Sequence, residues 1–417
     1  MPNAYAVVVL LALLAEYLLS VVVDVLNLRA MSPKLPAELA DVYDAETYRR
    51  SQQYTRARAR FALVPRSFQL LIVLGFWLSG GFGWLDLRLR ALGLPSVLTG
   101  LAYFAVLLVV QSLLELPFRI YGTFVIEARF GFNRTSPRTF VSDMLKAAML
   151  AVLLGGPFGA LVLVLFERAG GLAWLYCWLA VTALILVLQF VAPRWLMPLF
   201  IKFTPLQEGV LRKRILDYAA SVSFPLENLF VVDGSRRSSK ANAFFTGFGA
   251  HRRIGLYDTL IDRHSPDEVV AIVAHEVGHY KKRHVITSMV LSIVQLGFML
   301  AVFGFFLAQP ALYAAFFVAE PSAYVGLVLC GLLYSPVSLA LSIGLLARSR
   351  RHEHEADRFA VQTTGLADAL AEGLKKLTKD SLGNLTPHPG YVFLHHTHPP
   401  LLTRIAAIRA AQQDARA

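Results

Sequence analysis

Seven long apolar runs constrain the fold of this chain more than any other feature of its sequence. Each run has about 17 to 25 residues, the length that an α-helix needs to cross a hydrocarbon core about 30 Å thick. Hydrophobic residues make up 56% of the 417 residues and charged residues only 16%, which is typical of a membrane protein. We therefore predict a mainly α-helical, polytopic membrane protein with seven transmembrane helices. The runs are 4–26, 68–84, 98–120, 144–165, 172–192, 285–307 and 324–346.

The first run resembles a signal peptide only in its position. It has no basic residues before it, it exceeds the 7 to 15 apolar residues of a signal-peptide core, and no clear small-residue cleavage site follows it. We therefore expect it to remain as a membrane anchor.

Basic residues are distributed unevenly among the loops. The loops after the first and third runs hold most of them, whereas the opposite loops hold only Arg88, Arg90 and Arg168. Because Lys and Arg are enriched in cytoplasmic loops, we predict the N-terminus outside and both large polar blocks on the cytoplasmic side. The Ala-, Leu- and Arg-rich composition favours a bacterial inner membrane. The basic residues of the two loops are Arg29, Lys34, Arg49, Arg50, Arg56, Arg58, Arg60 and Arg66, then Arg119, Arg129, Arg134, Arg138 and Lys146.

The formal net charge of +12 does not indicate a nucleic-acid partner. The basic residues flank the spans, where anionic lipid headgroups attract them, and no nucleic-acid recognition module accompanies them. The bilayer is the expected partner of this charge. The two cysteines, Cys177 and Cys330, lie inside apolar runs, so we expect them to pack rather than to form a disulfide framework.

The polar blocks divide the chain into four parts. We expect an N-terminal membrane region at 1–201, a first part of a catalytic domain at 202–284, two spans at 285–347, and a second catalytic part at 348–417. In the first catalytic part, "NLFVVDG", "NAFFTGFG" and "HRRIGLYDTLI" are typical of short strands. The segment "SPDE" predicts a helix start, with Ser265 as N-cap, Pro266 at the first helical position and Glu268 closing a capping box.

That helix contains the segment "AHEVGH", which matches the H-E-x-x-H zinc motif. Residues four apart on a helix project from the same face, so His275 and His279 can both direct an imidazole at one cation, with Glu276 beside them. So short a motif also arises by chance, and its surroundings must decide.

A catalytic zinc site needs a third protein ligand. Position 285 is Val285, which excludes the metzincin arrangement, and His284 is one residue out of register. A distant carboxylate is therefore expected, and "SRRHEHEAD" after the seventh run holds Glu353 and Asp357 four residues apart. One of the two could bind the metal while the other orients a histidine. The alternative for this segment is a solvated charged helix beside a membrane span.

The chain resembles the type I CAAX prenyl endopeptidase family, which consists of intramembrane zinc metalloproteases. The motifs that carry the resemblance occur in order along nearly the whole chain: "EARFGFNRTSP", "APRWLMPLFIKFTPL", "GSRRSSKANAFFTGFGAHRRIGLYDTLI", "HEVGH", "SRRHEHEAD" and "HTHPPLLTRIAAI". The resemblance implies a barrel of seven transmembrane helices around a water-filled chamber, with a small α+β metalloprotease domain at the cytoplasmic face. It also implies peptide or protein substrates with a prenylated C-terminal CAAX segment.

Specific residues inherit roles from this resemblance. One zinc ion per chain would be bound by His275, His279 and Glu353, with Glu276 as general base. Asp357 would orient a zinc ligand, Asn242 would bind the substrate backbone, and His398 and Arg404 would act near the reacting carbonyl. The family usually has aromatic or apolar residues on either side of the glutamate ligand, whereas His352 and His354 stand there in this chain, so one of them could enter the metal shell.

Two other functions fit part of the sequence. One is a membrane quality-control metalloprotease of the heat-shock type, which has fewer spans and acts on misfolded or non-prenylated proteins. The other is a transporter or receptor with a vestigial H-E-x-x-H motif. Polar residues inside the runs favour a water-filled chamber, because they are costly in contact with lipid, although ion pairs in a dry bundle would also satisfy them. These residues are Glu16, Asp24, Glu115 and Gln295.

Overall fold

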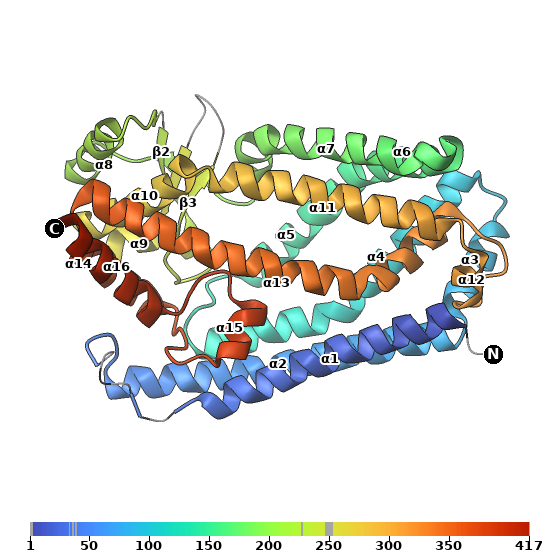
Figure 1. Cartoon of the computed structure of the whole chain (residues 1–417), viewed down its shortest axis with the longest axis horizontal. Helices are drawn as coiled ribbons and strands as arrows, with labels where there is room; N and C mark the ends of the chain where they lie inside the picture. Colours follow the sequence, from blue (N-terminus) through green and yellow to red (C-terminus); the bar gives the residue numbers. More distant parts are fainter. Residues whose placement is uncertain are drawn as a thin grey trace.

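The computed structural model of the chain describes residues 3–32, 34, 35, 37, 40–226, 228–246 and 253–416. The described residues are mainly helical, and the long helices lie roughly along the longest axis of the molecule (Figure 1). The α-helices are α1 (Ala4–Ala30), α2 (Ala45–Leu78), α3 (Gly81–Arg90), α4 (Ser96–Tyr121), α5 (Pro137–Leu150), α6 (Gly156–Arg168), α7 (Ala173–Val191), α8 (Val210–Ser221), α9 (Asp258–Arg263), α10 (Pro266–Lys281), α11 (His284–Leu307), α12 (Pro310–Ala314), α13 (Ala323–Thr364), α14 (Ala367–Asp380), α15 (Pro389–His395) and α16 (Leu401–Arg416). The strands are β1 (Phe203–Pro205), β2 (Asn228–Val232), β3 (Ala243–Thr246) and β4 (Arg253–Tyr257).

Seven helical segments of the described chain are long and apolar enough to cross a membrane. They are Ala4–Ala30, Ala45–Leu78, Ser96–Glu127, Pro137–Arg168, Gly170–Leu199, His284–Leu307 and Ala323–Thr364. The prediction of seven transmembrane helices is thus confirmed. Three of these segments contain short π-helical turns: the third span ends with Gly122–Glu127, and the fourth and fifth continue beyond Ala151–Gly155 and Ala192–Leu196.

The second span differs from its predicted bounds. Helix α2 begins at Ala45, far before the apolar run, because the Arg-, Gln- and Ala-rich segment ahead of it consists of good helix formers that carry no apolar signal. The helix ends at Leu78, and Gly80 follows in the left-handed conformation at φ 75°. The predicted run 68–84 therefore crosses a turn and enters α3.

The membrane helices enclose an open interior. Only 6–22% of the most apolar window of each span is buried, so side chains on more than one face of each helix are open. The accessible surface of 21,596 Å² also exceeds the value of about 16,000 Å² expected for a compact monomer of 46.1 kDa. Both observations agree with the predicted barrel around a chamber rather than with a close-packed bundle.

Two of the four polar residues predicted to avoid lipid have partners. Arg66 Nη1 lies 2.5 Å from Asp24 Oδ2, and this ion pair joins α1 to α2. Gln111 donates to Glu115 Oε1 at 3.0 Å within α4. These two carboxylates are satisfied by protein groups, as the alternative of internal pairing predicts.

A small mixed sheet lies at one end of the molecule. Its order is β1-β2-β4-β3, with β2 parallel to β4 and the other two pairs antiparallel, so β3 is an edge strand. The three predicted strands are confirmed, whereas β1 was too short to give a signal. Residues 247–249 of "NAFFTGFG" and 251–252 of "HRRIGLYDTLI" lie outside the described residues.

The sheet, α8, α10, α14 and α16 gather at the end of the long axis opposite the start of α1 (Figure 1). They share one buried core, which includes Ile254, Leu256, Val273, Leu370 and Ile405. This core fixes α10, the helix with the H-E-x-x-H segment, against the edge strand β3 and against α8 and α14.

Helix α13 is one continuous helix of 42 residues, about 63 Å long. It joins the seventh span to the predicted "SRRHEHEAD" helix without interruption, so the proposed division at 347/348 lies inside it. Helix α13 also packs closely on α10: a Cβ added to Gly278 would lie 3.1 Å from both Cα and O of Ala356. The glycine of "HEVGH" thus lets the two helices approach each other.

Candidate metal centre

Helix α10 presents two histidines on one face. The predicted capping box is present: the Ser265 hydroxyl accepts from the Glu268 N–H at 3.3 Å, and the Glu268 carboxylate accepts from the Ser265 N–H at 3.2 Å. Further along this helix, the Nε2 atoms of His275 and His279 lie 3.1 Å apart. The cap sets the start of the helix, and the 3.6-residue period then aligns the two imidazoles.

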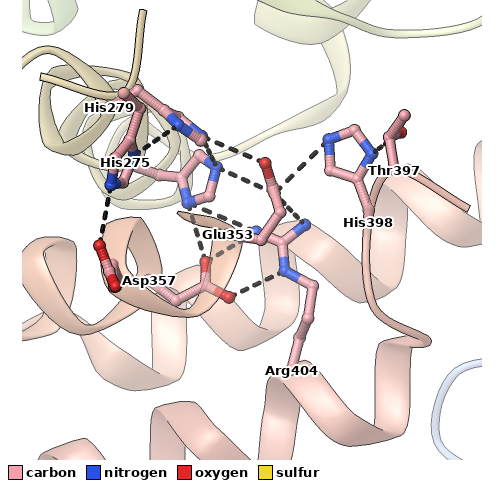
Figure 2. Close-up of polar contacts among 9 residues, drawn as sticks. His275, His279, Glu353, Asp357, Thr397, His398 and Arg404 are labelled. Atoms are coloured by element: carbon pink, nitrogen blue, oxygen red, sulfur yellow. Dashed lines mark hydrogen bonds and ion pairs between the residues drawn. The ribbon is translucent and has the colours of Figure 1, made fainter. Parts of the chain in front are cut away.

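Glu353 approaches both imidazoles from α13, as Figure 2 shows. Its Oε1 lies 3.2 Å from His279 Nε2, and its Oε2 lies 3.4 Å from His275 Nε2. With one donor atom taken from each of the three residues, all three atoms lie within 4.8 Å of one another, as a group that holds one metal ion requires. Glu353 Oε2 is buried and has no hydrogen-bond partner among the described residues, so a cation would satisfy it.

The donor set of the three residues fits a zinc-type ion. Two imidazole nitrogens and one carboxylate oxygen leave a fourth position open, as catalytic zinc sites do. The two histidines that flank Glu353 do not belong to the group found in the described residues. His352 Nε2 instead accepts from Arg348 at 3.3 Å, and His354 Nδ1 is buried without a hydrogen-bond partner among the described residues.

Asp357 and Arg404 lie behind His275. Asp357 Oδ1 is 2.8 Å from His275 Nδ1, so it accepts the Nδ1–H and leaves Nε2 facing the metal position. Arg404 bonds both oxygens of Asp357, at 2.7 and 2.8 Å, and all three side chains are buried. Burial disfavours the charged form of His275, but hydrogen bonds with Asp357 and Glu353 prevail and raise its pKa to about 9. A metal ion must therefore displace a proton from this imidazole near neutral pH.

Glu276 follows His275 in α10 and is half-buried. Burial raises the pKa of its carboxyl group, while the positive charge that His275 and His279 can carry opposes this shift. A carboxylate with a raised pKa is a stronger proton acceptor, which is what a general base requires.

His398 faces the centre from the opposite side of Glu353 (Figure 2). It lies in the loop between α15 and α16, its Nε2 is 3.5 Å from Glu353 Oε2, and its side chain is 61% exposed. Thr397 Oγ1 lies 2.8 Å from His398 Nδ1 and holds the ring. The sequence motif "HPPLLTR" thus brings His398 and Arg404 to two different sides of the same carboxylate.

Asn242 directly precedes the edge strand β3 and is exposed. Its carbonyl accepts from the Tyr257 N–H at 3.0 Å, and its side-chain oxygen accepts from the Ala243 N–H at 2.9 Å. No hydrogen bond of the described residues joins Asn242 to the metal ligands. The structure therefore brings seven of the eight predicted residues together and leaves Asn242 on the neighbouring strand.

Two supporting residues of the centre were not predicted from the sequence. Lys240, just before β3, lies 3.1 Å from Glu127 Oε2 and 2.8 Å from Tyr54 Oη, which ties the edge strand to α2 and to the helical turn after α4. Glu127 stands in the "EARFGFNRTSP" motif, but its partner is more than a hundred residues away. His284, one residue out of register for a metzincin ligand, has its Nδ1 3.1 Å from His279 Nδ1.

Comparison with known protein families divides the chain into two matched regions. Residues 24–202 match a family described as the CAAX prenyl protease N-terminal region with five membrane helices. Residues 205–412 match peptidase family M48, and they include every residue that we place at the metal centre.

Curated relatives are similar to the chain over almost its full length. A CAAX prenyl protease 1 homolog from Oryza sativa subsp. japonica is 36% identical, and the match covers 98% of each chain. CAAX prenyl protease 1 from Saccharomyces cerevisiae is 31% identical over 90% of this chain and 88% of its own length. The Homo sapiens homolog is 30% identical over 91% and 89%. These relatives are eukaryotic, so they do not support the bacterial membrane that the composition favoured.

Among solved structures, the crystal structure of S. mikatae Ste24p is similar to the chain with a TM-score of 0.91 and 30% identity. The match covers 98% of this chain and 100% of that one, so the membrane helices and the catalytic end both correspond. Neither the heat-shock type of protease nor a non-enzymatic membrane protein is favoured by these full-length matches. The chain belongs to the CAAX prenyl protease family within peptidase family M48, and it is a multi-pass membrane metalloendopeptidase.

Proposed function

We propose that the chain binds one zinc ion through His275, His279 and Glu353 and uses it to hydrolyse peptide bonds. The observation that supports this most directly is the convergence of three side chains from two helices, whose nearest donor atoms lie 3.1–3.4 Å apart. When bound, zinc lowers the pKa of water towards about 7 and polarises a carbonyl group.

The protein groups around this position have separate tasks in the proposed reaction. Glu276 accepts a proton from the attacking water and delivers it to the leaving nitrogen. His398 and the Nη1 of Arg404, which lies 3.6 Å from Glu353 Oε2, donate to the oxygen on which negative charge develops. Asp357 holds the Nδ1–H of His275 and thereby keeps the tautomer that binds the metal.

The substrate would lie along β3 as an added strand. An edge strand offers main-chain donors and acceptors to an extended peptide, and this mode of binding tolerates varied side chains. The exposed amide of Asn242 stands at the start of that edge, and the Lys240 contacts to Tyr54 and Glu127 keep the edge in place.

The proposed substrates are proteins with a prenylated C-terminal CAAX segment. The names of the curated relatives support this class, since they are CAAX prenyl proteases. A barrel with an open interior also offers space for an extended chain end and its lipid. We further propose the division into 1–201, 202–284, 285–347 and 348–417, with the N-terminus outside and the catalytic end cytoplasmic, as the arginine-rich loops favour.

The purified full-length chain should cleave a farnesylated CAAX peptide and lose that activity after zinc chelation. The same peptide without the farnesyl group is the matched substrate, and Glu276→Gln is the matched inactive enzyme. Equal kcat/KM for both peptides would remove prenylation from the proposal while leaving the peptidase intact. Cleavage of neither peptide by a zinc-loaded chain would remove the CAAX substrate class.

A further inference from the structure

The two histidines of the metal centre are supported by different groups. His275 Nδ1 meets a carboxylate, Asp357, whereas His279 Nδ1 lies 3.1 Å from Nδ1 of another histidine, His284. His284 Nε2 in turn lies 3.0 Å from Glu355 Oε2. The contacts form a continuous line from His279 through His284 to Glu355.

Once His279 Nε2 faces a metal, only one placement of protons makes both contacts, His279 to His284 and His284 to Glu355, into hydrogen bonds. His279 must then carry its proton on Nδ1, and it donates that proton to His284. His284 must accept at Nδ1, so its own proton is on Nε2 and is donated to the carboxylate of Glu355. Every nitrogen of the pair then has a donor or acceptor role that matches its neighbour.

The local backbone explains how His284 reaches this position. Helix α10 ends at Lys281, and Arg283 adopts the left-handed conformation at φ 59°, which redirects the chain before α11 begins at His284. In a continuous helix, the side chain five residues after His279 would point away from it. The turn at Arg283 instead directs the imidazole of His284 back towards His279.

His352 fixes the ring of His284 from the side. The two imidazoles are stacked, with centroids 3.9 Å apart and planes within 4° of each other. His284 is buried, and together with His352 and His279 it lines a cavity of about 430 Å³ between α7, α11 and α13. The stack prevents rotation of a ring that both hydrogen bonds require in one orientation.

We propose that His284 is a positioning residue for the second zinc ligand, held in its tautomer by Glu355 and in its plane by His352. This inference rests on the proposed zinc site. It assigns a role to the unusual residues that flank Glu353: His352 supports the metal shell from behind rather than entering it. Partners of this kind keep a ligand imidazole oriented and basic, and their loss weakens metal affinity by about 10- to 100-fold.

The test is the zinc dissociation constant of the purified, chelator-treated full chain, measured with buffered zinc. His284→Phe keeps an aromatic ring that stacks on His352 but removes both hydrogen bonds, and it should weaken zinc binding by about 10- to 100-fold. His284→Gln, whose amide can both accept and donate, should restore most of the lost affinity. His354→Phe is the matched control, because it makes the same change beside Glu353 at a ring that has no hydrogen bond at Nδ1.

Glu355→Ala provides a second test at a position that is 38% exposed, where substitution leaves the core intact. It should weaken zinc binding in the same direction, whether or not His284→Phe folds. An unchanged zinc dissociation constant in His284→Phe or Glu355→Ala would overturn the positioning role of His284 but would not contradict the metal site. Equal losses of zinc affinity in His284→Phe and His284→Gln would also overturn this role, because altered packing would then explain both. A wild-type chain that binds no zinc would overturn the metal site as well.

Discussion

The two sides of the metal centre are built differently. On the side that holds the metal, Asp357 is 1% exposed, Glu353 4% and Arg404 8%, and all three are joined by ionic contacts at close range. On the side that meets the substrate, Asn242 is exposed and the side chain of His398 is 61% exposed, and each is held by short-range bonds to its neighbours.

This difference separates two kinds of mutational effect. Groups on the metal side are mutually dependent, since removal of one leaves a buried charge without its partner. Groups on the substrate side can be altered without that penalty, so their loss should change kinetics and leave metal binding and folding intact. Glu276 stands between the two sides and tests the boundary.

The largest effect should come from Glu276→Gln. The amide cannot accept the proton of water, so we expect kcat to fall by about 10²- to 10⁴-fold. Zinc content and the melting temperature should stay at wild-type values, because Glu276 is not a ligand in the proposed site. Elemental analysis and peptide cleavage on one preparation measure both, and normal turnover would show that another group is the base.

On the metal side, Asp357→Ala should destabilise the protein by about 3 to 5 kcal/mol, because Arg404 remains buried without its partner. Zinc affinity should fall as well, by about 10- to 100-fold. Glu355→Ala is the comparison for stability: it should cost less, because it removes the acceptor of one neutral N–H of His284 and leaves no buried charge without a partner. Denaturant unfolding measures both variants. Equal losses of unfolding free energy in the two would contradict the difference between the two sides.

On the substrate side, Asn242→Ala should reduce kcat/KM by about 5- to 150-fold, the equivalent of one lost contact worth about 1 to 3 kcal/mol. Zinc affinity should not change. If Asn242 serves only as a turn residue, the variant would melt earlier while its folded fraction cleaves normally. Kinetics and thermal unfolding on the same sample distinguish these outcomes.

The last prediction concerns pH. Since the pKa of His275 is raised to about 9, its imidazole is protonated below that pH, and the proton competes with zinc. The apparent affinity for zinc should therefore rise by about tenfold per unit between pH 6 and pH 8, with one proton released from His275 on binding. A pH-independent dissociation constant over this range would contradict the role of Asp357 and Glu353 in raising the pKa.

Much of this arrangement could be predicted because it depends on local periodicity. The i, i+4 spacing of His275 and His279 and the capping box at Ser265 follow from helix geometry alone. The third metal ligand could be predicted only in part. Residue spacing left Glu353 and Asp357 as equal candidates, and only the family resemblance separated them.

Contacts that depend on a chain reversal or on two remote segments could not be predicted. His284 reaches His279 only because Arg283 turns the backbone, and Lys240 meets Glu127 across 113 residues. The arginine-rich start of α2 was missed for another reason: a helix that is polar on this stretch gives no hydrophobic period to detect.

The continuity of α13 has a mechanical consequence. The helix that spans the bilayer continues past Pro336 without ending and carries Glu353 and Asp357 on its extension, so a tilt that the lipid imposes on the span can reach the metal ligands. Transmembrane helices adjust their tilt to the thickness of the hydrocarbon layer. Acyl-chain length should therefore act on catalysis through the geometry of the active centre, and cleavage rates in bilayers of graded thickness would measure that coupling.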